Sequence, residues 1–309
     1  MMNVPKIAVL LAAYNGVEWL PDQVESILRQ EGVQVTLFIS VDRSTDGTEE
    51  WCETLQAKHS NVHVLPTGLR FGGASRNFFR LMRDVDLEPY DAVSLADQDD
   101  IWYLDKLARG YDVMRTQDCD AYSSNVLAFW SDGREMLVEK HQPQVQFDYL
   151  FEAAGPGCTY LLSGKLAGEF KSFLMGQWDQ IQDVSLHDWL IYAYSRSHDR
   201  RWFIDSTPTM RYRQQASNQF GVNAGLTAKK GRLTQVLSGW WLSQSLLIAE
   251  LLGVKDSAFV VSWSSLNTMA LMRLAGASWQ CRRRVKDKVF FFGLCLVLIG
   301  ARITGHKSA

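Results

Sequence analysis

The stretch VSLADQDDIW, residues 93–102, decides how this chain folds. A short apolar run follows Pro89 and leads directly into three carboxylates, Asp97, Asp99 and Asp100, which predicts a buried strand that ends in an acidic loop. Alternate side chains of an extended backbone share a face, so we expect Asp97 and Asp99 to point to the same spot. The stretch therefore predicts two oxygen ligands aimed at one place.

Two carboxylates this close need a partner, because like charges repel and raise each other's pKa unless a positive charge lies between them. With no His or Cys cluster nearby, oxygen ligands favour Mg²⁺ or Mn²⁺ over zinc, and Mg²⁺ often shares its coordination with substrate phosphates. The alternative is a solvated acidic turn, or a helix N-cap at Asp100 before the helix-like segment 101–114.

Composition describes an ordinary globular protein. The 309 residues are 47% hydrophobic and 21% charged, with a net charge of -2, which allows one or two domains and argues against a nucleic-acid binder. The five cysteines are scattered and never spaced as CxxC, which argues against a disulfide framework or zinc site and favours a reducing compartment. The apolar run 7–13 is near the lower length limit of a signal-peptide core and has only Lys6 before it, so it is better explained as a first strand.

Strands and helices alternate along the first part of the chain. The expected strands are 6–13, 35–41, 62–66, 93–96, 121–130 and 202–205. The expected helices are 19–30, 48–58, 74–85, 101–115, 164–174 and 183–194. This alternation predicts right-handed βαβ units on a parallel sheet, with a ligand site at the carboxyl ends of the strands.

Glycines mark two further places where a ligand can approach the backbone. Gly72 and Gly73 precede an expected helix with Arg76 in its first turn, an arrangement that admits an anion near backbone N–H groups. Gly157 lies in an expected tight turn that enters a strand. In both places the alternative is an ordinary turn without a ligand.

Composition changes after Gly225, and we divide the chain into an α/β domain, residues 1–225, and a helical region, residues 226–309. Two helices are expected over 233–252 and 257–275. The basic cluster that begins at Arg282 then precedes thirteen apolar residues, fewer than the ~20 that span a bilayer. Such a segment suits a helix lying on an anionic membrane surface, and the alternative is a core helix that docks on its own domain.

Four motifs, taken in order, resemble one enzyme family. They are Ala13-Tyr14-Asn15, Asp42-x-Ser44-x-Asp46-Gly47-Thr48, Asp97-Gln98-Asp99-Asp100 and His187-Asp188-Trp189. The ordered set resembles family 2 inverting glycosyltransferases over roughly residues 5–220 and is far more specific than any one motif. The resemblance implies the GT-A fold, a Rossmann-like and mostly parallel sheet flanked by helices, here with a C-terminal helical extension.

The variants DQDDIWYLDKL, RNFFRLM, HDW and YRQQASNQFG look most like bacterial rhamnosyltransferases of cell-wall and O-antigen polysaccharide synthesis. That likeness implies dTDP-L-rhamnose as the donor and a saccharide acceptor, carried on a lipid. It also implies a cytoplasmic protein that contacts the inner face of the cell membrane peripherally through its C-terminal helix. A homo-oligomer is compatible with this picture.

The resemblance implies a role for each matching residue. Donor-binding residues would be Ala13, Tyr14, Asn15, Glu18, Asp42, Ser44, Asp46, Arg76, Asp97 and Arg213. Asp42 would accept the hydrogen of the pyrimidine N3, Asp99 would bind the Mg²⁺ or Mn²⁺, and Asp188 would be the general base. Gln215 stands where relatives commonly carry a metal-binding His. Residues on the acceptor side would be Gly157, Cys158, Thr159, His187 and Trp189.

Three alternatives remain open at this point. The same fold can use a UDP-sugar donor, with galactose, glucose or an amino sugar. The protein can instead be a non-catalytic nucleotide-sugar-binding subunit of a polysaccharide assembly complex. A cytosolic nucleotidyltransferase also combines an α/β sheet with paired aspartates, but the glycine-rich, lysine-bearing signature of that class is missing from the N-terminal segment.

Overall fold

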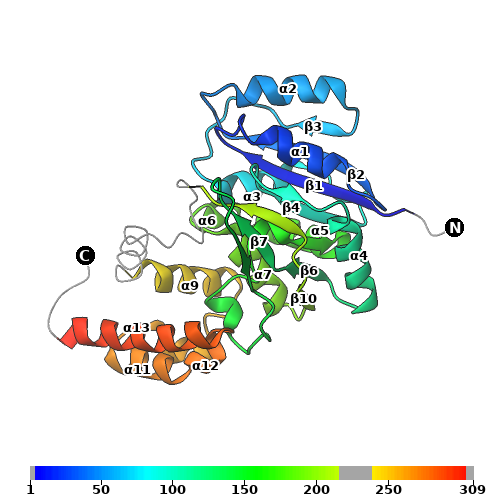
Figure 1. Ribbon diagram of the computed structural model, residues 1–309. Coiled ribbons are helices and arrows are strands. Elements are labelled where there is room, and N and C mark those ends of the chain that lie inside the picture. Colours follow the sequence, from blue (N-terminus) through cyan, green and yellow to red (C-terminus); the bar gives the residue numbers. More distant parts are fainter. Residues whose placement is uncertain (1–3, 216–238, 304–309) are drawn as a thin grey trace.

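The central strand β1 (Lys6–Ala13) is apolar along its length because each of its two sides faces a separate core. Ala8 and Leu10 point into one core, whereas Val9 and Leu11 point into the other. The structure, a computed structural model, describes residues 4–215 and 239–303 (Figure 1). Burial on both faces explains why this strand reads as one continuous apolar run.

The main sheet has the order β10-β6-β9-β4-β1-β2-β3. Its other strands are β2 (Gln34–Val41), β3 (Val62–Val64), β4 (Ala92–Ala96), β6 (Ala121–Ser124), β9 (Leu161–Ser163) and β10 (Trp202–Asp205). Strand β9 runs antiparallel to β4 and β6, and the other pairings are parallel. The prediction of a mostly parallel sheet is therefore confirmed, and the carboxyl ends of β1, β2 and β4 share one edge.

Helices cover both faces of this sheet (Figure 1). Those of the α/β part are α1 (Leu20–Leu28), α2 (Thr48–Lys58), α3 (Ala74–Asp84), α4 (Lys106–Thr116), α5 (Gly164–Gly176), α6 (Trp178–Ile181) and α7 (His187–Ser197). Buried residues of α1, α2 and α4 belong to one core and those of α3, α5 and α7 to the other. Helix α5 begins where the Ser163 side chain accepts a hydrogen bond from the Leu166 N–H at 3.2 Å.

A second, smaller sheet of order β5-β11-β7-β8 corrects two predictions. Its strands are β5 (Ile101–Trp102), β7 (Val126–Phe129), β8 (Glu135–Val138) and β11 (Met210–Arg213). The helix expected from residue 101 begins only at Lys106, because Ile101 and Trp102 pair with β11, so Asp100 is not a helix N-cap. The strand expected over 121–130 is divided at Asn125, whose amide donates to the Ser206 carbonyl.

The C-terminal part is helical, as expected. It contains α9 (Trp240–Leu251), α10 (Ala258–Ser264), α11 (Thr268–Gly276), α12 (Ser278–Cys281) and α13 (Val285–Ile303). The single helix expected over 257–275 is broken at Leu266, which has a φ of 51°, and Asn267 then caps α11. The expected division at residue 225, the end of the YRQQASNQFG motif and the start of the helix expected from 233 lie outside the described residues.

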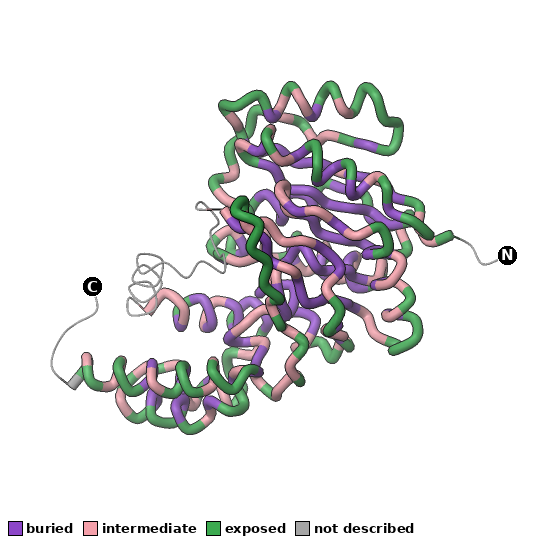
Figure 2. The backbone as a smooth tube through the Cα atoms, viewed as in Figure 1, coloured by how far each residue is buried: buried purple, intermediate pink, exposed green. Residues whose placement is uncertain are grey.

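Helix α13 packs against the rest of the helical part with one face only. Phe291, Leu294 and Cys295 are buried in contact with α11 and α12, while the opposite face of the helix is exposed (Figure 2). Among residues 4–215 and 239–303, no helix is both long enough and apolar enough to cross a membrane. The same helix therefore packs on its own protein with one face and exposes apolar residues on the other.

Buried charges tie the helical part to the α/β part. Asp148, in the 3-10 helix η1 (Asp148–Leu150), is fully buried and forms ion pairs with Arg196 at 3.0 Å and with Arg283 at 3.3 Å. The Tyr192 hydroxyl donates a third hydrogen bond to the same carboxylate at 2.8 Å. Arg282, next to Arg283 in the basic cluster, also forms an ion pair, with Glu152. Both arginines are therefore used within the protein.

We predict that Arg283→Met lowers the free energy of unfolding by about 3 kcal/mol or more, because it leaves part of the Asp148 charge buried without a partner. Chemical denaturation followed by circular dichroism measures the effect. The matched control is Arg284→Met, one residue along the chain but exposed, which should change stability by less than about 0.5 kcal/mol. Equal stabilities for the two variants would contradict the prediction.

Candidate active site

The loops that follow β1 and β4 are joined by one side-chain amide. Gln98 accepts from the Tyr14 backbone N–H at 2.7 Å and donates to the Tyr14 carbonyl at 3.0 Å. Gly16 makes room for this amide, since a Cβ atom there would lie 2.2 Å from the Gln98 Oε1 atom. Tyr14 itself is exposed and so is Glu18, which leaves both side chains available at the edge of the sheet.

The loop after β2 is held against the loop after β1 by reciprocal hydrogen bonds. The Asn15 side-chain oxygen accepts a hydrogen bond from the Thr45 backbone N–H at 2.9 Å, and the Asn15 backbone N–H donates to the Ser44 hydroxyl at 3.0 Å. Asp46 accepts from the Val17 N–H at 3.1 Å and from the Thr48 hydroxyl at 2.6 Å. These hydrogen bonds lower the pKa of Asp46 even though burial opposes them.

Asp42 follows β2 directly and is almost fully buried. Its two oxygens accept the backbone N–H groups of Phe71 at 2.8 Å and Gly72 at 2.9 Å, so the carboxylate fixes the glycine-rich loop in front of α3. Gly72 has a φ of 79°, a left-handed value that favours glycine. Arg76, in the first turn of α3, is exposed and donates from Nε to the Gln182 carbonyl at 3.0 Å.

The acidic segment is a turn and not an extended strand, which corrects the argument from alternating side chains. Strand β4 ends at Ala96, and residues 97–100 turn toward β5. One carboxylate oxygen of Asp97, one of Asp100 and the Cys158 Sγ atom all lie within 4.8 Å of one another. Burial, followed by repulsion from the Asp99 carboxylate, raises the pKa of Asp97 to about 7.

Asp100 is the most deeply buried carboxylate of this turn. Its Oδ1 atom accepts the Arg213 backbone N–H at 3.1 Å, whereas its Oδ2 atom is buried without a hydrogen-bond partner among the described residues. Burial and the nearby carboxylates of Asp99 and Asp97 raise its pKa well above the ordinary value. An orphaned oxygen among other hard oxygen atoms fits a divalent cation of the Mg²⁺ or Mn²⁺ type.

Asp99 lies beside the end of β11 and the residues just after it. The Gln215 amide donates to its Oδ2 atom at 2.5 Å, and the Arg213 Nε donates to its backbone carbonyl at 2.8 Å. Arg213 also pairs with Asp22 at 3.3 Å. Gln215 therefore contacts the expected metal-binding carboxylate, although the three-atom cluster itself involves Asp97 and Asp100. The expected role of Asp99 as a metal ligand stays a prediction.

Asp188, in the first turn of α7, lies near the acidic turn, and the place where these carboxylates meet is the candidate site. Its Oδ1 atom accepts the Trp189 N–H at 2.8 Å. Burial raises its pKa to about 6, against the opposing effect of the Lys140 ammonium group. Asp188 is also close enough to Asp97 to raise the pKa of that carboxyl. Segments more than ninety residues apart thus bring their carboxylates together.

Gly157 packs directly against α7. A Cβ atom on this glycine would lie 2.5 Å from the His187 Nε2 atom and 3.2 Å from the Asp188 Cβ atom. The His187 ring stacks on Phe78 with ring centres 4.0 Å apart, and its Nε2 atom has no hydrogen-bond partner in the described part of the chain. Burial lowers the pKa of His187 to about 3, so the ring is neutral near pH 7.

Three of the expected acceptor-side residues are buried in the structure, and their expected role stays a prediction. Cys158 and Thr159 are fully buried in the 3-10 helix η2 (Gly157–Thr159), and burial raises the pKa of the Cys158 thiol well above its usual value. Trp189 is also buried, and its indole donates to the Tyr149 carbonyl at 2.8 Å. In this structure these three side chains pack within the protein next to the carboxylates.

Two lysines beside the carboxylates had not been singled out as site residues. The Lys106 Nζ atom is buried, donates to the Cys158 carbonyl at 3.0 Å and lies 4.1 Å from the centre of the Trp102 ring. Burial lowers the pKa of Lys106 to about 8. Lys140 approaches Asp188 from the segment after β8, and burial lowers its pKa too. Lys106 lies within the quoted stretch DQDDIWYLDKL without having been given a role, and Lys140 belongs to no motif that could have marked it.

Comparison with known proteins agrees with this geometry. The family model described as "Glycosyl transferase family 2" matches residues 8–173. The chain is 43% identical over 289 residues to the protein described as "dTDP-rhamnosyl transferase RfbG" from Shigella flexneri, an alignment that covers 93% of this chain and 99% of that protein. The chain belongs to glycosyl transferase family 2.

Solved structures of glycosyltransferases share the fold of this family 2 member. The 1-349 segment of S. aureus TarS in complex with UDP-GlcNAc has a TM-score of 0.55 at 13% identity, covering 97% of this chain and 92% of that one. A longer TarS structure is covered over 54% of its length. The Pyrobaculum calidifontis mannosyltransferase PcManGT, in complex with GDP-Man and Mn²⁺, has a TM-score of 0.52 at 15% identity, with coverage of 98% and 87%. The expected GT-A fold is confirmed.

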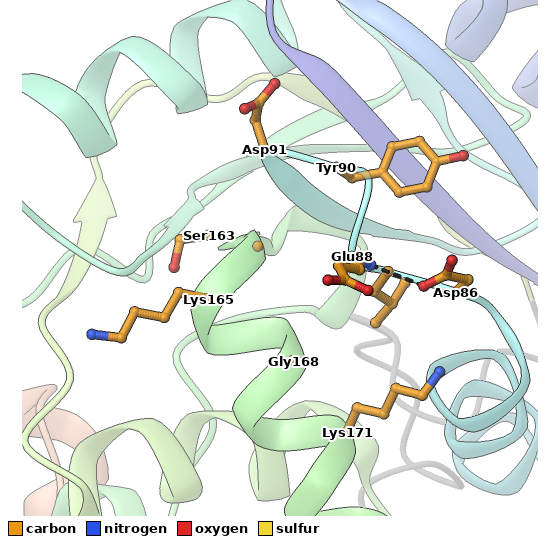
Figure 3. Close-up of a pocket in the computed structure, with 10 residues that line it drawn as sticks. Asp86, Glu88, Tyr90, Asp91, Ser163, Lys165, Gly168 and Lys171 are labelled. Carbon is orange, nitrogen blue, oxygen red and sulfur yellow. Dashed lines mark hydrogen bonds between the residues drawn. The ribbon is translucent and has the colours of Figure 1, made fainter.

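A surface depression of about 660 Å³ lies away from these carboxylates (Figure 3). Tyr90 and Asp91 in its wall precede β4, and Ser163 ends the antiparallel strand β9, so the depression lies at the amino end of β4. Asp97 follows the opposite end of that strand. The depression contains none of the expected site residues.

We predict that Gly157→Ala lowers the turnover of the protein by about 10- to 100-fold, because the added methyl group displaces His187 and Asp188 by a fraction of an ångström to an ångström. Nucleotide affinity, measured by calorimetry, should change little. The matched control is Gly168→Ala in α5, where an added Cβ has no neighbour within 4 Å. Turnover of Gly157→Ala equal to that of the control would show that the packing does not position Asp188.

Proposed function

We propose that the protein is an inverting glycosyltransferase that moves L-rhamnose from dTDP-rhamnose to a hydroxyl group of a saccharide acceptor carried on a lipid. The observation that carries the chemistry is a partly buried Asp188, with its pKa raised to about 6, close enough to Asp97 of the acidic turn to raise the pKa of that carboxyl. The donor is inferred from the similarity to the Shigella flexneri transferase over 99% of its length.

Asp188 is the proposed general base. Its Oδ1 atom is held by the Trp189 N–H, which leaves the Oδ2 atom to take the proton of the acceptor hydroxyl as that oxygen attacks the anomeric carbon. Attack from the face opposite the leaving diphosphate inverts the configuration. A pKa near 6 keeps the carboxylate ionised at neutral pH and makes it a stronger base than a carboxylate on the surface.

The leaving diphosphate needs stabilisation of its negative charge and no separate acid. The carboxylates of the 97–100 turn are the proposed site of a Mg²⁺ or Mn²⁺ ion, which would neutralise phosphate charge when bound. Arg76 stands in the first turn of α3, where backbone N–H groups and the helix dipole also attract an anion. The Asp42 carboxylate keeps the loop before that helix in place.

Nucleotide binding is proposed for the loops after β1 and β2. Tyr14 offers an exposed ring at this edge, and the backbone around it is fixed by Gln98 and Asn15. The Asp42 oxygens already accept two backbone N–H groups, and an ionised carboxylate has capacity for one more donor such as a pyrimidine N3. A rigid loop lowers the entropy cost of binding the base and ribose.

We further propose that the protein works at the cytoplasmic face of the cell membrane. A lipid-carried acceptor would require the candidate site to lie near a bilayer. Helix α13 has an exposed apolar face, and basic residues precede it. Peripheral contact is therefore the arrangement that fits both the acceptor class and this helix.

The test is incubation of the purified protein with Mg²⁺ or Mn²⁺, dTDP-rhamnose and lipid-linked saccharide acceptors, followed by mass spectrometry of the product. We expect Asp188→Asn to lower turnover by about 10²- to 10⁴-fold with unchanged dTDP affinity. Asp183→Asn, an exposed carboxylate shortly before α7, is the matched control and should keep full activity. Full turnover of Asp188→Asn would refute the base assignment, and a clear preference for UDP-sugars would overturn the donor.

A pH profile tests the same carboxylate in another way. Because Asp188 acts in its ionised form and has a raised pKa of about 6, kcat/KM should fall as the pH drops through about 6. Lys140→Met removes a positive charge that holds this pKa down, so the acidic limb should move to higher pH. Lys255→Met, which removes an exposed lysine paired with Glu250, should leave the limb unmoved. An unmoved limb in Lys140→Met would mean that Asp188 is not the titrating group.

A further inference from the structure

The outer face of α13 is apolar where a surface helix is normally polar. This face consists of Val285, Val289, Phe290, Phe292, Leu296 and Val297, each between 41% and 65% exposed. An amphipathic helix of a globular protein usually directs charged and polar residues to solvent. Here the helix has apolar residues on its inner and outer faces alike, so we expect a further partner to cover the outer one.

The spacing makes this outer face a continuous stripe. Val285, Val289, Phe292 and Leu296 follow one another at intervals of four, three and four residues, which places them on one side of a helix. Phe290 and Val297, seven residues apart, form a second exposed row, which Gly293 and Gly300 separate from the first. Over twelve residues the stripe is about 18 Å long at the helical rise of ~1.5 Å per residue.

Neighbouring helices add to the exposed apolar surface of this region. Met269 and Met272 of α11 and Trp279 of α12 are each about half exposed, between 46% and 55%. Figure 1 shows α11, α12 and α13 together at one end of the molecule, and Figure 2 shows how much of their length is exposed. The apolar surface is thus a property of a whole end of the protein.

Positive charge accompanies this apolar end. Residues 257–303 contain seven basic residues and one acidic residue, in a chain whose net charge is -2. Arg282 and Arg283 are used in internal ion pairs, but Arg284 and Lys286 at the start of α13 and Arg302 at its end are exposed. The charge available to a partner is positive at both ends of the stripe.

Charge decides between the possible occupants. A second copy of the chain, docked by a two-fold axis through this face, would bring the same basic residues of both copies together. A neutral apolar partner would leave those charges without a counterpart. An anionic bilayer surface satisfies both features, because its headgroups attract lysine and arginine and its acyl boundary accepts aromatic and aliphatic side chains.

We propose that the outer face of α13 docks on the surface of an anionic lipid bilayer, with the helix axis parallel to the membrane plane. The inference rests on the membrane location proposed above and assigns that contact to named residues. Phe290, Phe292 and Leu296 enter the acyl boundary, and Arg284 and Lys286 contact the headgroups. The ion pairs of Arg283 with the buried Asp148 then fix the orientation of the α/β part relative to the bilayer.

Vesicle co-sedimentation of the full chain tests the proposal. Wild-type protein should sediment with phosphatidylcholine vesicles that contain phosphatidylglycerol and much less with phosphatidylcholine alone. Phe290→Glu combined with Val297→Glu should weaken binding to the anionic vesicles at least tenfold. The matched control is Met175→Glu, since Met175 in α5 is 56% exposed, close to the 59% of Phe290. Unchanged binding of the double variant, or no binding of the wild type, overturns the proposal.

A second variant keeps the test valid if the glutamates disturb folding. Lys286→Gln combined with Lys288→Gln removes charge only, and it should reduce binding to anionic vesicles and its sensitivity to salt. Analytical ultracentrifugation without lipid tests the other occupant: a dimer abolished by Phe290→Glu, with vesicle binding unaffected, would assign the face to a second copy and overturn the proposal.

Transfer assays separate this inference from the proposed function. With a soluble saccharide acceptor, the Phe290→Glu and Val297→Glu variant should transfer sugar at the wild-type rate, because both residues are exposed on α13, which carries none of the proposed site residues. Loss of transfer by this folded variant would contradict a purely docking role. Wild-type protein that binds anionic vesicles but transfers no sugar to any acceptor would refute the proposed function and leave the docking intact.

Discussion

The constraint on which the site depends is the withdrawal of several carboxylates from water at one edge of a sheet. Asp97, Asp100 and Asp188 all have raised pKa values, chiefly because burial penalises their charged forms. The protein offsets part of this cost with lysine ammonium groups and backbone N–H groups, and the Gln215 amide donates to the neighbouring Asp99 carboxylate. The Asp100 Oδ2 atom, buried without a hydrogen-bond partner among the described residues, is the atom that a cation at the proposed metal site would satisfy.

Such a site requires that the loops after β1, β2 and β4 stay together, and hydrogen bonds between these loops hold them in place. Gln98 lies within the acidic turn itself and bonds both backbone groups of Tyr14, so the turn and the first loop form one unit. Asn15 extends that unit to the loop after β2. The bracing uses neutral amides, whose hydrogen bonds add no further charge to a site that already holds several carboxylates.

Sequence patterns predicted the parts of the fold in which local periodicity and burial agree. Strand β1 was placed correctly because both of its faces are buried, and the βαβ order followed from it. Ile101 and Trp102 were wrongly assigned to a helix, since a two-residue strand has no period and its partner is β11, more than a hundred residues away. Lys140 lies beside Asp188 through tertiary folding alone, and the burial of Arg283 in a basic cluster likewise has no local signal.

The basic cluster before α13 shows why residues of one charge and one stretch can have opposite roles. Arg283 is directed inward by the buried Asp148, which can be kept ionised only if cations surround it. Arg284 is exposed beside the apolar outer face of the helix. Arg283 and Arg284 thus connect the buried core to the outer face of α13. A surface bound to that face would therefore be held in a fixed position relative to the sheet that carries the candidate site. The orientation of the candidate site toward a lipid-carried acceptor would then be set by the fold itself and not by a flexible tether.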